Sequence, residues 1–211
     1  MKSSTFDRGT RRQLLSLFLV CGIAEFANYM ICLGMVYHLS SRFALDAFEI
    51  GMASSVNTAS YLIFCLLFES QYEKLKPAVC ICISLVGMGL CTIWMSNTFE
   101  VLVFITLLFL YGAFRSMLWP QITGLINRGK EGLELSKAQG GFNLSWSLFS
   151  GISPLFSGLI LQFSTSTVFL VSSGLVFCSV AFLFSSRITR EADSDRSRIQ
   201  FETMLDHSTS L

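Results

Sequence analysis

Six long apolar segments constrain the fold of this 211-residue chain more than any other feature of its sequence. A helix needs about 20 apolar residues to cross the roughly 30 Å hydrocarbon layer of a bilayer. Each segment reaches that length, and short connectors hold most of the charged residues. The predicted spans are Gln13–Leu39, Phe48–Glu69, Pro77–Met95, Glu100–Ile126, Ala138–Leu161 and Thr167–Ser186. The sequence therefore predicts an all-α, polytopic membrane protein.

The composition excludes several other classes of protein. Charged residues make up 14% of the chain, whereas soluble domains hold about 25%. The formal net charge is only +1, so the chain lacks the basic field of a nucleic-acid-binding protein. The seven cysteines lie inside apolar segments and form no CxxC pair, which argues against a metal site. We therefore expect no metal, no cofactor and no nucleic-acid partner.

The distribution of Lys and Arg predicts the orientation of the helices. If the N-terminus is cytoplasmic, 13 of the 15 basic residues fall in cytoplasmic segments; the others are Arg42 and Arg115. We therefore expect a multi-pass protein of the cytoplasmic (inner) membrane with both termini in the cytoplasm. Its predicted parts are a cytoplasmic N-terminal segment at 1–12, a six-helix transmembrane domain at 13–186, and a polar cytoplasmic tail or linker at 187–211.

Two ionisable residues lie deep inside the predicted spans, Glu25 in the first and Arg115 in the fourth. An ionisable group in hydrocarbon is costly unless it faces protein or water, so each is a candidate functional residue. Both lie roughly 16 Å from the cytoplasmic ends of their helices, at about 1.5 Å per residue. One hypothesis is that they pair, and that protonation of Glu25 releases Arg115 for an anionic ligand. The alternative is a static ion pair that only holds the bundle together.

Three amides are further candidates for a solute-binding cavity. Asn28 lies one turn beyond Glu25 and shares its helix face. Asn57 and Asn143 lie in the second and fifth spans, where hydrogen bonds between helices would explain them about as well as a bound ligand.

Two tryptophans and a histidine have the same double interpretation. Trp146 and Trp119 could stack on a solute, although tryptophan more often anchors a helix at the lipid interface. We count Trp146 among the candidate cavity residues. His38, near the outer boundary, is expected to be an interfacial residue rather than part of a proton relay.

The fifth span carries small residues at helical spacing around a proline, in the stretch GGFNLSWSLFSGISPLFSGLI. Residues such as Gly151 and Gly158 let another backbone approach closely. Pro154 removes a backbone hydrogen bond and should kink the helix. We expect a tightly packed and hinging element here.

Short motifs accompany this pattern. The stretch CLLFESQYEKLK resembles the loop motif GxLaDrxGrr of the major facilitator superfamily, with Glu69 at the position of the acid. In the fourth span, Gly112 matches the glycine of an Arg-x-x-x-Gly motif, and GISPLFSG in the fifth resembles GPxxGG. Over residues 13–186 the chain resembles the N-terminal six-helix half of a transporter of that superfamily.

The resemblance implies two three-helix repeats, in which the first and fourth helices line a central cavity and the third and sixth face lipid. It also implies that the second and fifth helices meet a second six-helix half, supplied by another copy of the chain or by a separate one. A truncated gene is the third possibility. Residues with an implied gating or packing role are Glu69, Gly112, Gly151, Pro154 and Gly158.

Two functions from different classes follow. The first is a secondary transporter, or half of one, that moves a small organic solute by alternating access, with Glu25 as the proton-linked carboxylate. The second is a non-transporting membrane scaffold or inactive remnant, in which Glu25 and Arg115 merely pair. An enzyme is not expected, because the helices contain no Ser/His, HExxH or paired-Asp constellation.

Overall fold

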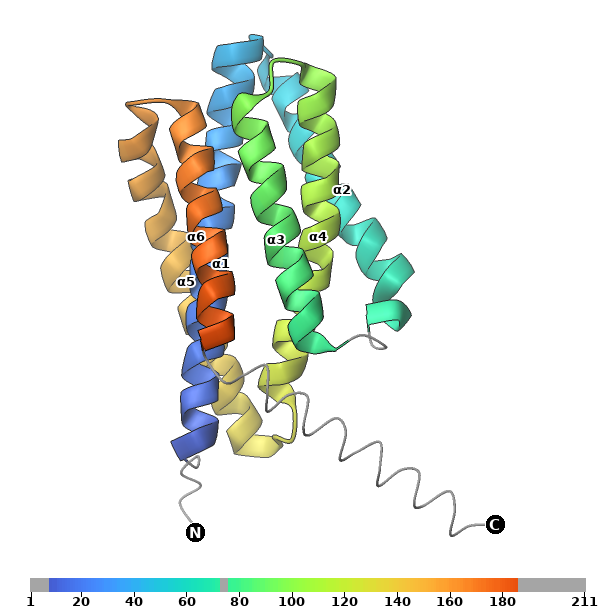
Figure 1. Ribbon diagram of the computed structural model, residues 1–211, viewed down its shortest axis with the longest axis vertical. Helices are drawn as coiled ribbons and strands as arrows, with labels where there is room; N and C mark the ends of the chain where they lie inside the picture. Colours follow the sequence, from blue (N-terminus) through green and yellow to red (C-terminus); the bar gives the residue numbers. More distant parts are fainter. Residues whose placement is uncertain (1–7, 73–75, 186–211) are drawn as a thin grey trace.

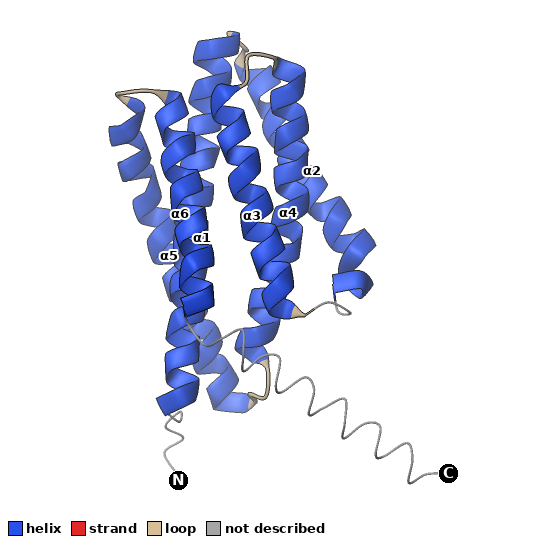
Figure 2. Cartoon of the chain, viewed as in Figure 1, coloured by secondary structure: helices blue, strands red, loops and turns tan. Residues whose placement is uncertain are grey.

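The computed structural model describes residues 8–72 and 76–185, and all of its regular structure within those ranges is helical (Figures 1 and 2). All six helices are long and apolar enough to cross a membrane, which confirms the six predicted spans. They are α1 (Arg8–Phe43), α2 (Ala47–Tyr72), α3 (Pro77–Asn97), α4 (Val101–Asn127), α5 (Gly132–Leu161) and α6 (Thr165–Ser185). The predicted terminal segments at 1–12 and 187–211 lie largely or wholly outside the described residues.

Two helices extend well beyond their predicted ends. α1 continues to Phe43, and α5 begins at Gly132, six residues before the apolar segment. The prediction counted apolar residues, whereas helical hydrogen bonding continues into polar sequence at the membrane surface.

Gly129 and Gly132 adopt φ values of 65° and 53° in the tight connection between α4 and α5. This left-handed region favours glycine.

The packing of the helices divides them into two groups. α1 packs against α5 and α6, α4 packs against α2 and α3, and α3 against α6 joins the two groups (Figure 1). Exchanging α1 with α4, α2 with α5 and α3 with α6 leaves this set of pairs unchanged. Such a pattern favours the expected pair of three-helix repeats, which stays a prediction.

Serine hydroxyls link the helices of several of these packed pairs. Ser60 of α2 donates to the carbonyl oxygen of Phe109 at 2.5 Å, and Ser153 of α5 donates to that of Phe26 at 2.7 Å. Similar bonds run from Ser84 to Phe114 and from Ser173 to Gly89. In a membrane, where lipid is as apolar as the protein interior, such small polar contacts favour helix association.

The contact between α2 and α4 is closest at Gly112. A Cβ atom there would meet the backbone oxygen of Asn57, and would come within 2.9 Å of the Asn57 side-chain oxygen and 3.0 Å of the Ser60 Cβ. The close approach of the two backbones therefore requires glycine at this position. Gly112 fixes the position of α4 along α2.

The helices differ in how much of their surface the bundle covers. The apolar windows of α1 and α3 are each 61% buried, whereas those of α2 and α5 are 17% and 11% buried. α3 lies between α4 and α6, so it is more enclosed than a helix that mainly faces lipid. α2 and α5 are the two helices that leave most of their surface without a partner within the described residues.

Candidate solute-binding site

The buried carboxylate of Glu25 lies at the centre of the candidate site. It sits mid-way along α1 and only 1% of its surface is exposed. Oε1 accepts a hydrogen bond from the Asn28 side-chain amide at 3.4 Å, one turn along the helix. Within the part of the chain that the structure describes, Oε2 is buried without a hydrogen-bonding partner. A buried ionisable group inside a membrane span is a candidate for binding a proton or a ligand.

Tyr111 of α4 completes a polar chain that the sequence did not indicate. Its hydroxyl donates to Oδ1 of Asn28 at 3.1 Å, and the ring is fully buried. Because the Asn28 carbonyl accepts from Tyr111, its amino group is directed at Glu25. The chain Tyr111–Asn28–Glu25 therefore ties α4 to the carboxylate on α1.

Arg115 lies one turn beyond Tyr111 on α4. Its guanidinium carbon stands 5.3 Å from the ring centroid of Tyr61 on α2, and its Nε is buried without a hydrogen-bonding partner among the described residues. The positive charge of Arg115 interacts electrostatically with the Glu25 carboxylate, and the Trp146 indole of α5 also interacts with it. Within the described residues, no hydrogen bond joins Glu25 and Arg115. The guanidinium is therefore near Glu25 without being saturated by it.

A pocket of about 350 Å³ opens beside Arg115, between α2, α4 and α5. Tyr61, Trp119, Phe142 and Trp146 give it aromatic walls; Thr123 and Asn143 add polar groups. The ring centroids of Trp119 and Phe142 are 6.4 Å apart and those of Trp146 and Tyr29 are 6.5 Å apart, both edge to face. Arg115 is the only charged residue among those that line the pocket.

The other candidate residues are distributed over different surfaces. Asn57 is buried at the α2–α4 contact, where its Oδ1 lacks a partner within the described residues, and it does not line the pocket. Gly151, Pro154 and Gly158 are exposed on α5. Added Cβ atoms at the two glycines would meet nothing within 4 Å. Glu69 lies within the span of α2, but its side chain is outside the described residues.

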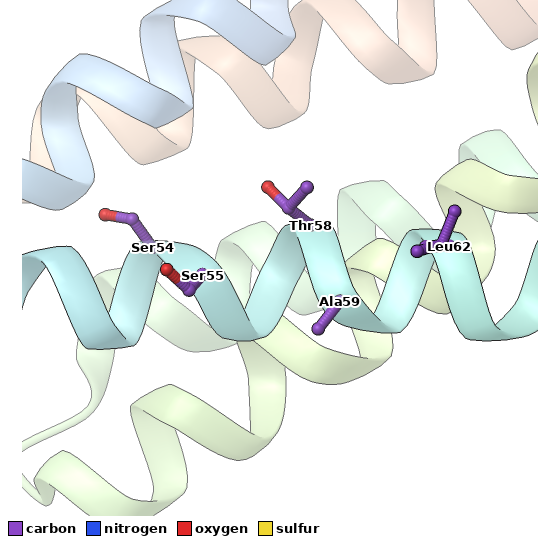
Figure 3. A pocket seen from close by; sticks show the side chains of 5 residues that line it. All are labelled: Ser54, Ser55, Thr58, Ala59 and Leu62. Atoms are coloured by element: carbon purple, nitrogen blue, oxygen red, sulfur yellow. The ribbon is translucent and has the colours of Figure 1, made fainter.

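A second hollow, of about 430 Å³, follows α2 alone (Figure 3). Ser54, Thr58 and Leu62 rise from one side of the helix in that view, with Ser55 and Ala59 beside them. No charged side chain lines it, and no second helix contributes to it. The pocket at Arg115 is therefore the stronger candidate for a solute site.

His38 lies inside the protein rather than at the lipid interface, which corrects the expectation from its position in the sequence. It is fully buried, and its Nδ1 is 2.9 Å from the hydroxyl of Thr165. The rings of Phe43, Phe104 and Phe169 surround it. The last turns of α1 extend far enough for α4 and α6 to close over this side chain.

Within the described residues, no group of three His, Cys, Asp or Glu side chains could hold a metal.

Comparison with known proteins places this geometry in a family. The model of the Major Facilitator Superfamily matches residues 17–206. No curated protein sequence matches the chain.

Solved transporters share the fold at low identity. A Glu-to-Gln mutant of the peptide transporter POT, in complex with sulfate, has a TM-score of 0.74 and 11% identity, and the match covers 93% of this chain and 45% of that one. A second structure of that mutant gives the same values. A POT family transporter in complex with a thioalcohol-conjugated peptide has a TM-score of 0.69 and 14% identity, covering 94% and 45%. The chain thus spans about half the length of these transporters.

Proposed function

The chain belongs to the major facilitator superfamily, whose model covers most of its length, and from this premise we propose that it forms one six-helix half of a secondary transporter. It moves a small organic solute across the cytoplasmic membrane by alternating access, with both chain termini in the cytoplasm. The function involves no catalytic step.

One observation carries this proposal. The Glu25 carboxylate is buried in the middle of a membrane-spanning helix, in a polar chain with Asn28 and Tyr111, next to a pocket that holds Arg115. Intramembrane ionisable groups that face a cavity mark the paths of solutes and protons in transporters. A structural ion pair would instead leave both groups saturated by each other, and Glu25 Oε2 and Arg115 Nε are both without a partner within the described residues.

Proton coupling is assigned to Glu25. Arg115 on α4 is the charged group that acts on its carboxylate, and Glu25 in turn acts on titratable groups of three helices: Tyr111 on α4, Tyr61 on α2, and Cys21 and Cys32 on α1 itself. Protonation would remove the negative charge that the Arg115 guanidinium senses and leave that cation free for a solute. Asn143 and Trp146 line the pocket beside Arg115 and would contact the solute there. Asn28 lies outside that lining and bonds to Glu25, and Asn57 stabilises the adjoining α2–α4 contact.

A second six-helix half meets this one through α2 and α5. These helices bury the smallest share of their surfaces within the bundle. On α5, Ser145, Ser153 and Ser157 face inward, whereas Gly151, Pro154 and Gly158 form an exposed strip of small residues. Small residues let a neighbouring backbone approach closely. The partner is either a second copy or a separate chain.

Access of water to the pocket tests the proposal without knowledge of the solute. Asn143→Cys, in membrane vesicles, is treated with a membrane-impermeant maleimide, and labelling of the unsubstituted chain is subtracted to correct for the native cysteines. Gly174→Cys is the matched control, since Gly174 is exposed mid-way along α6 and a Cβ there meets nothing within 4 Å.

We expect Asn143→Cys to be labelled faster than Gly174→Cys. Because the thiolate is the form that reacts, both rates rise with pH, so the ratio of the two rates is compared at each pH. We expect this ratio to change between acidic and alkaline buffer, and Glu25→Gln to remove that change. Equal labelling of the two positions would contradict a solute path and favour a non-transporting scaffold. A change in the ratio that survives Glu25→Gln would assign proton coupling to another residue.

A further inference from the structure

We propose that the pocket at Arg115 binds a small organic anion with a flat aromatic body, the anionic group lying on the guanidinium and the ring between the aromatic walls. The inference rests on the proposed transport function and names the class of solute that its site accepts.

The residues that line the pocket indicate that the solute carries a negative charge. Arg115 is cationic, and none of the other six lining residues is acidic or basic. Glu25 is absent from the lining; it is buried and accepts a hydrogen bond from Asn28. An arginine fork binds a carboxylate through two parallel hydrogen bonds. Because Nε has no acceptor among the described residues, a carboxylate from the solute would satisfy a donor that the protein leaves unpaired.

The shape of the solute follows from the walls. Four aromatic side chains from three helices surround the space: Tyr61, Trp119, Phe142 and Trp146. Aromatic rings prefer offset-stacked or edge-to-face partners, so a flat ring gains contacts on several sides. Such walls also attract organic cations. Here the positive charge of Arg115 opposes a cation, the lining contains no acidic side chain, and protonation of Glu25 outside the lining removes the negative charge that acts on Arg115.

The position of the pocket separates a free solute from a lipid headgroup. Arg115 lies twelve residues from Asn127 at the end of α4, which is about 18 Å at 1.5 Å per residue. That depth is near the middle of a hydrocarbon layer roughly 30 Å thick, beyond the reach of a headgroup. From Arg115 to Thr123 the pocket extends about 12 Å along α4, and Thr123 and Asn143 supply polar contacts for substituents on the ring.

Tryptophan fluorescence gives a direct test, because two of the three tryptophans line the pocket and the third, Trp94, is 66% exposed on α3. The Trp94→Phe chain reports on the pocket alone. Four probes are titrated into it in detergent: benzoate, its uncharged analogue benzamide, the ringless anion acetate, and benzylammonium as the cation of similar size.

We expect benzoate to bind most tightly and benzamide about tenfold to a hundredfold more weakly, which is the range for loss of a charge-assisted hydrogen bond. Arg115→Gln should weaken benzoate by a similar factor and leave benzamide unchanged. Arg42→Gln is the matched control: it removes an arginine that stands 4.2 Å over Phe99, outside the pocket, and should leave benzoate binding unchanged.

Tighter binding of benzylammonium than of benzoate would overturn the inference, and so would equal binding of benzoate and benzamide. Both results come from the Trp94→Phe chain with Arg115 intact, so they stand even if Arg115→Gln fails to fold. If none of the probes binds while Asn143→Cys is still labelled by the aqueous maleimide, the class of solute is wrong and the transport function survives. If Asn143→Cys is not labelled either, both are wrong.

Discussion

Gly112 is the residue at which a single methyl group should most disturb the site. In Gly112→Ala, the new Cβ would collide with the backbone oxygen of Asn57 and crowd its side-chain oxygen at 2.9 Å. A backbone oxygen inside a helix cannot move aside alone, so α4 must separate from α2. Tyr111 and Arg115 lie on the same stretch of α4 and would move with it.

The expected cost has two parts. Overpacking of a well-filled contact costs about 1–3 kcal/mol. Separation of the helices also lengthens the bond from Ser60 to the Phe109 carbonyl, and hydrogen bonds between membrane helices contribute about 0.6 kcal/mol each, up to about 1.7. Replacing a helical glycine by alanine returns up to about 1 kcal/mol. The lost hydrogen bond and the helix-propensity gain are similar in size and opposite in sign, so we expect Gly112→Ala to lower the free energy of unfolding by about 1–3 kcal/mol, which is the overpacking cost.

Gly124→Ala provides the matched control. Gly124 lies on the same helix, and a Cβ atom there would meet nothing within 4 Å, so only the helix-propensity gain applies. The free energy of unfolding is measured for both variants by denaturant titration in mixed micelles. If Gly112→Ala were as stable as Gly124→Ala, the close approach of α2 and α4 would be wrong, and with it the placement of Arg115 beside Tyr61.

Four further predictions concern single contacts. Tyr111→Phe leaves the Asn28 amide oxygen buried without its donor, so thermal melting should show a loss of about 1–3 kcal/mol; an unchanged melting curve would contradict the polar chain. Ser153→Ala removes the bond to the Phe26 carbonyl and should cost about 0.6–1.7 kcal/mol in the same assay, whereas Ser147→Ala, at an exposed position, should cost nothing measurable. Gly151→Leu should leave the melting curve unchanged but abolish co-purification with the second half; loss of folding instead would place Gly151 inside the bundle. His38→Phe fills an aromatic cluster but strands the Thr165 hydroxyl, so it should lower stability without changing the labelling rate of Asn143→Cys.

The six spans could be predicted because length and apolarity alone decide whether a helix crosses a bilayer. Glu25 and Arg115 could be found for the same reason, since a charge inside such a segment needs protein or water around it. In this structure the charge of Arg115 acts on the Glu25 carboxylate, and that the two residues form a functional site stays a prediction. A direct pair between the two is a finer hypothesis. In this structure Glu25 contacts Asn28, and Arg115 contacts the ring of Tyr61.

The direction in which each helix face points could not be predicted from the sequence. Lipid and the protein interior are equally apolar, so periodicity does not distinguish them as it does in a soluble protein. The sequence therefore does not single out Tyr111 as a site residue, although it does single out Asn28, to which Tyr111 bonds. Likewise the sequence predicts that small residues of α5 pack closely, but only the packed helices reveal that Ser153 faces α1 while Gly151 and Gly158 are exposed. The burial of His38 could not be predicted either, because the aromatic residues around it come from α4 and α6 as well as α1.

Labelling of Asn143→Cys from each side of the native membrane is the most direct test of alternating access around this site. The impermeant maleimide is applied to right-side-out and to inside-out vesicles from cells that express the full chain. If the site faces each side in turn, the cysteine will react in both preparations, and Glu25→Gln will shift the ratio of the two rates. Reaction from one side only, with a ratio that Glu25→Gln leaves unchanged, would contradict it.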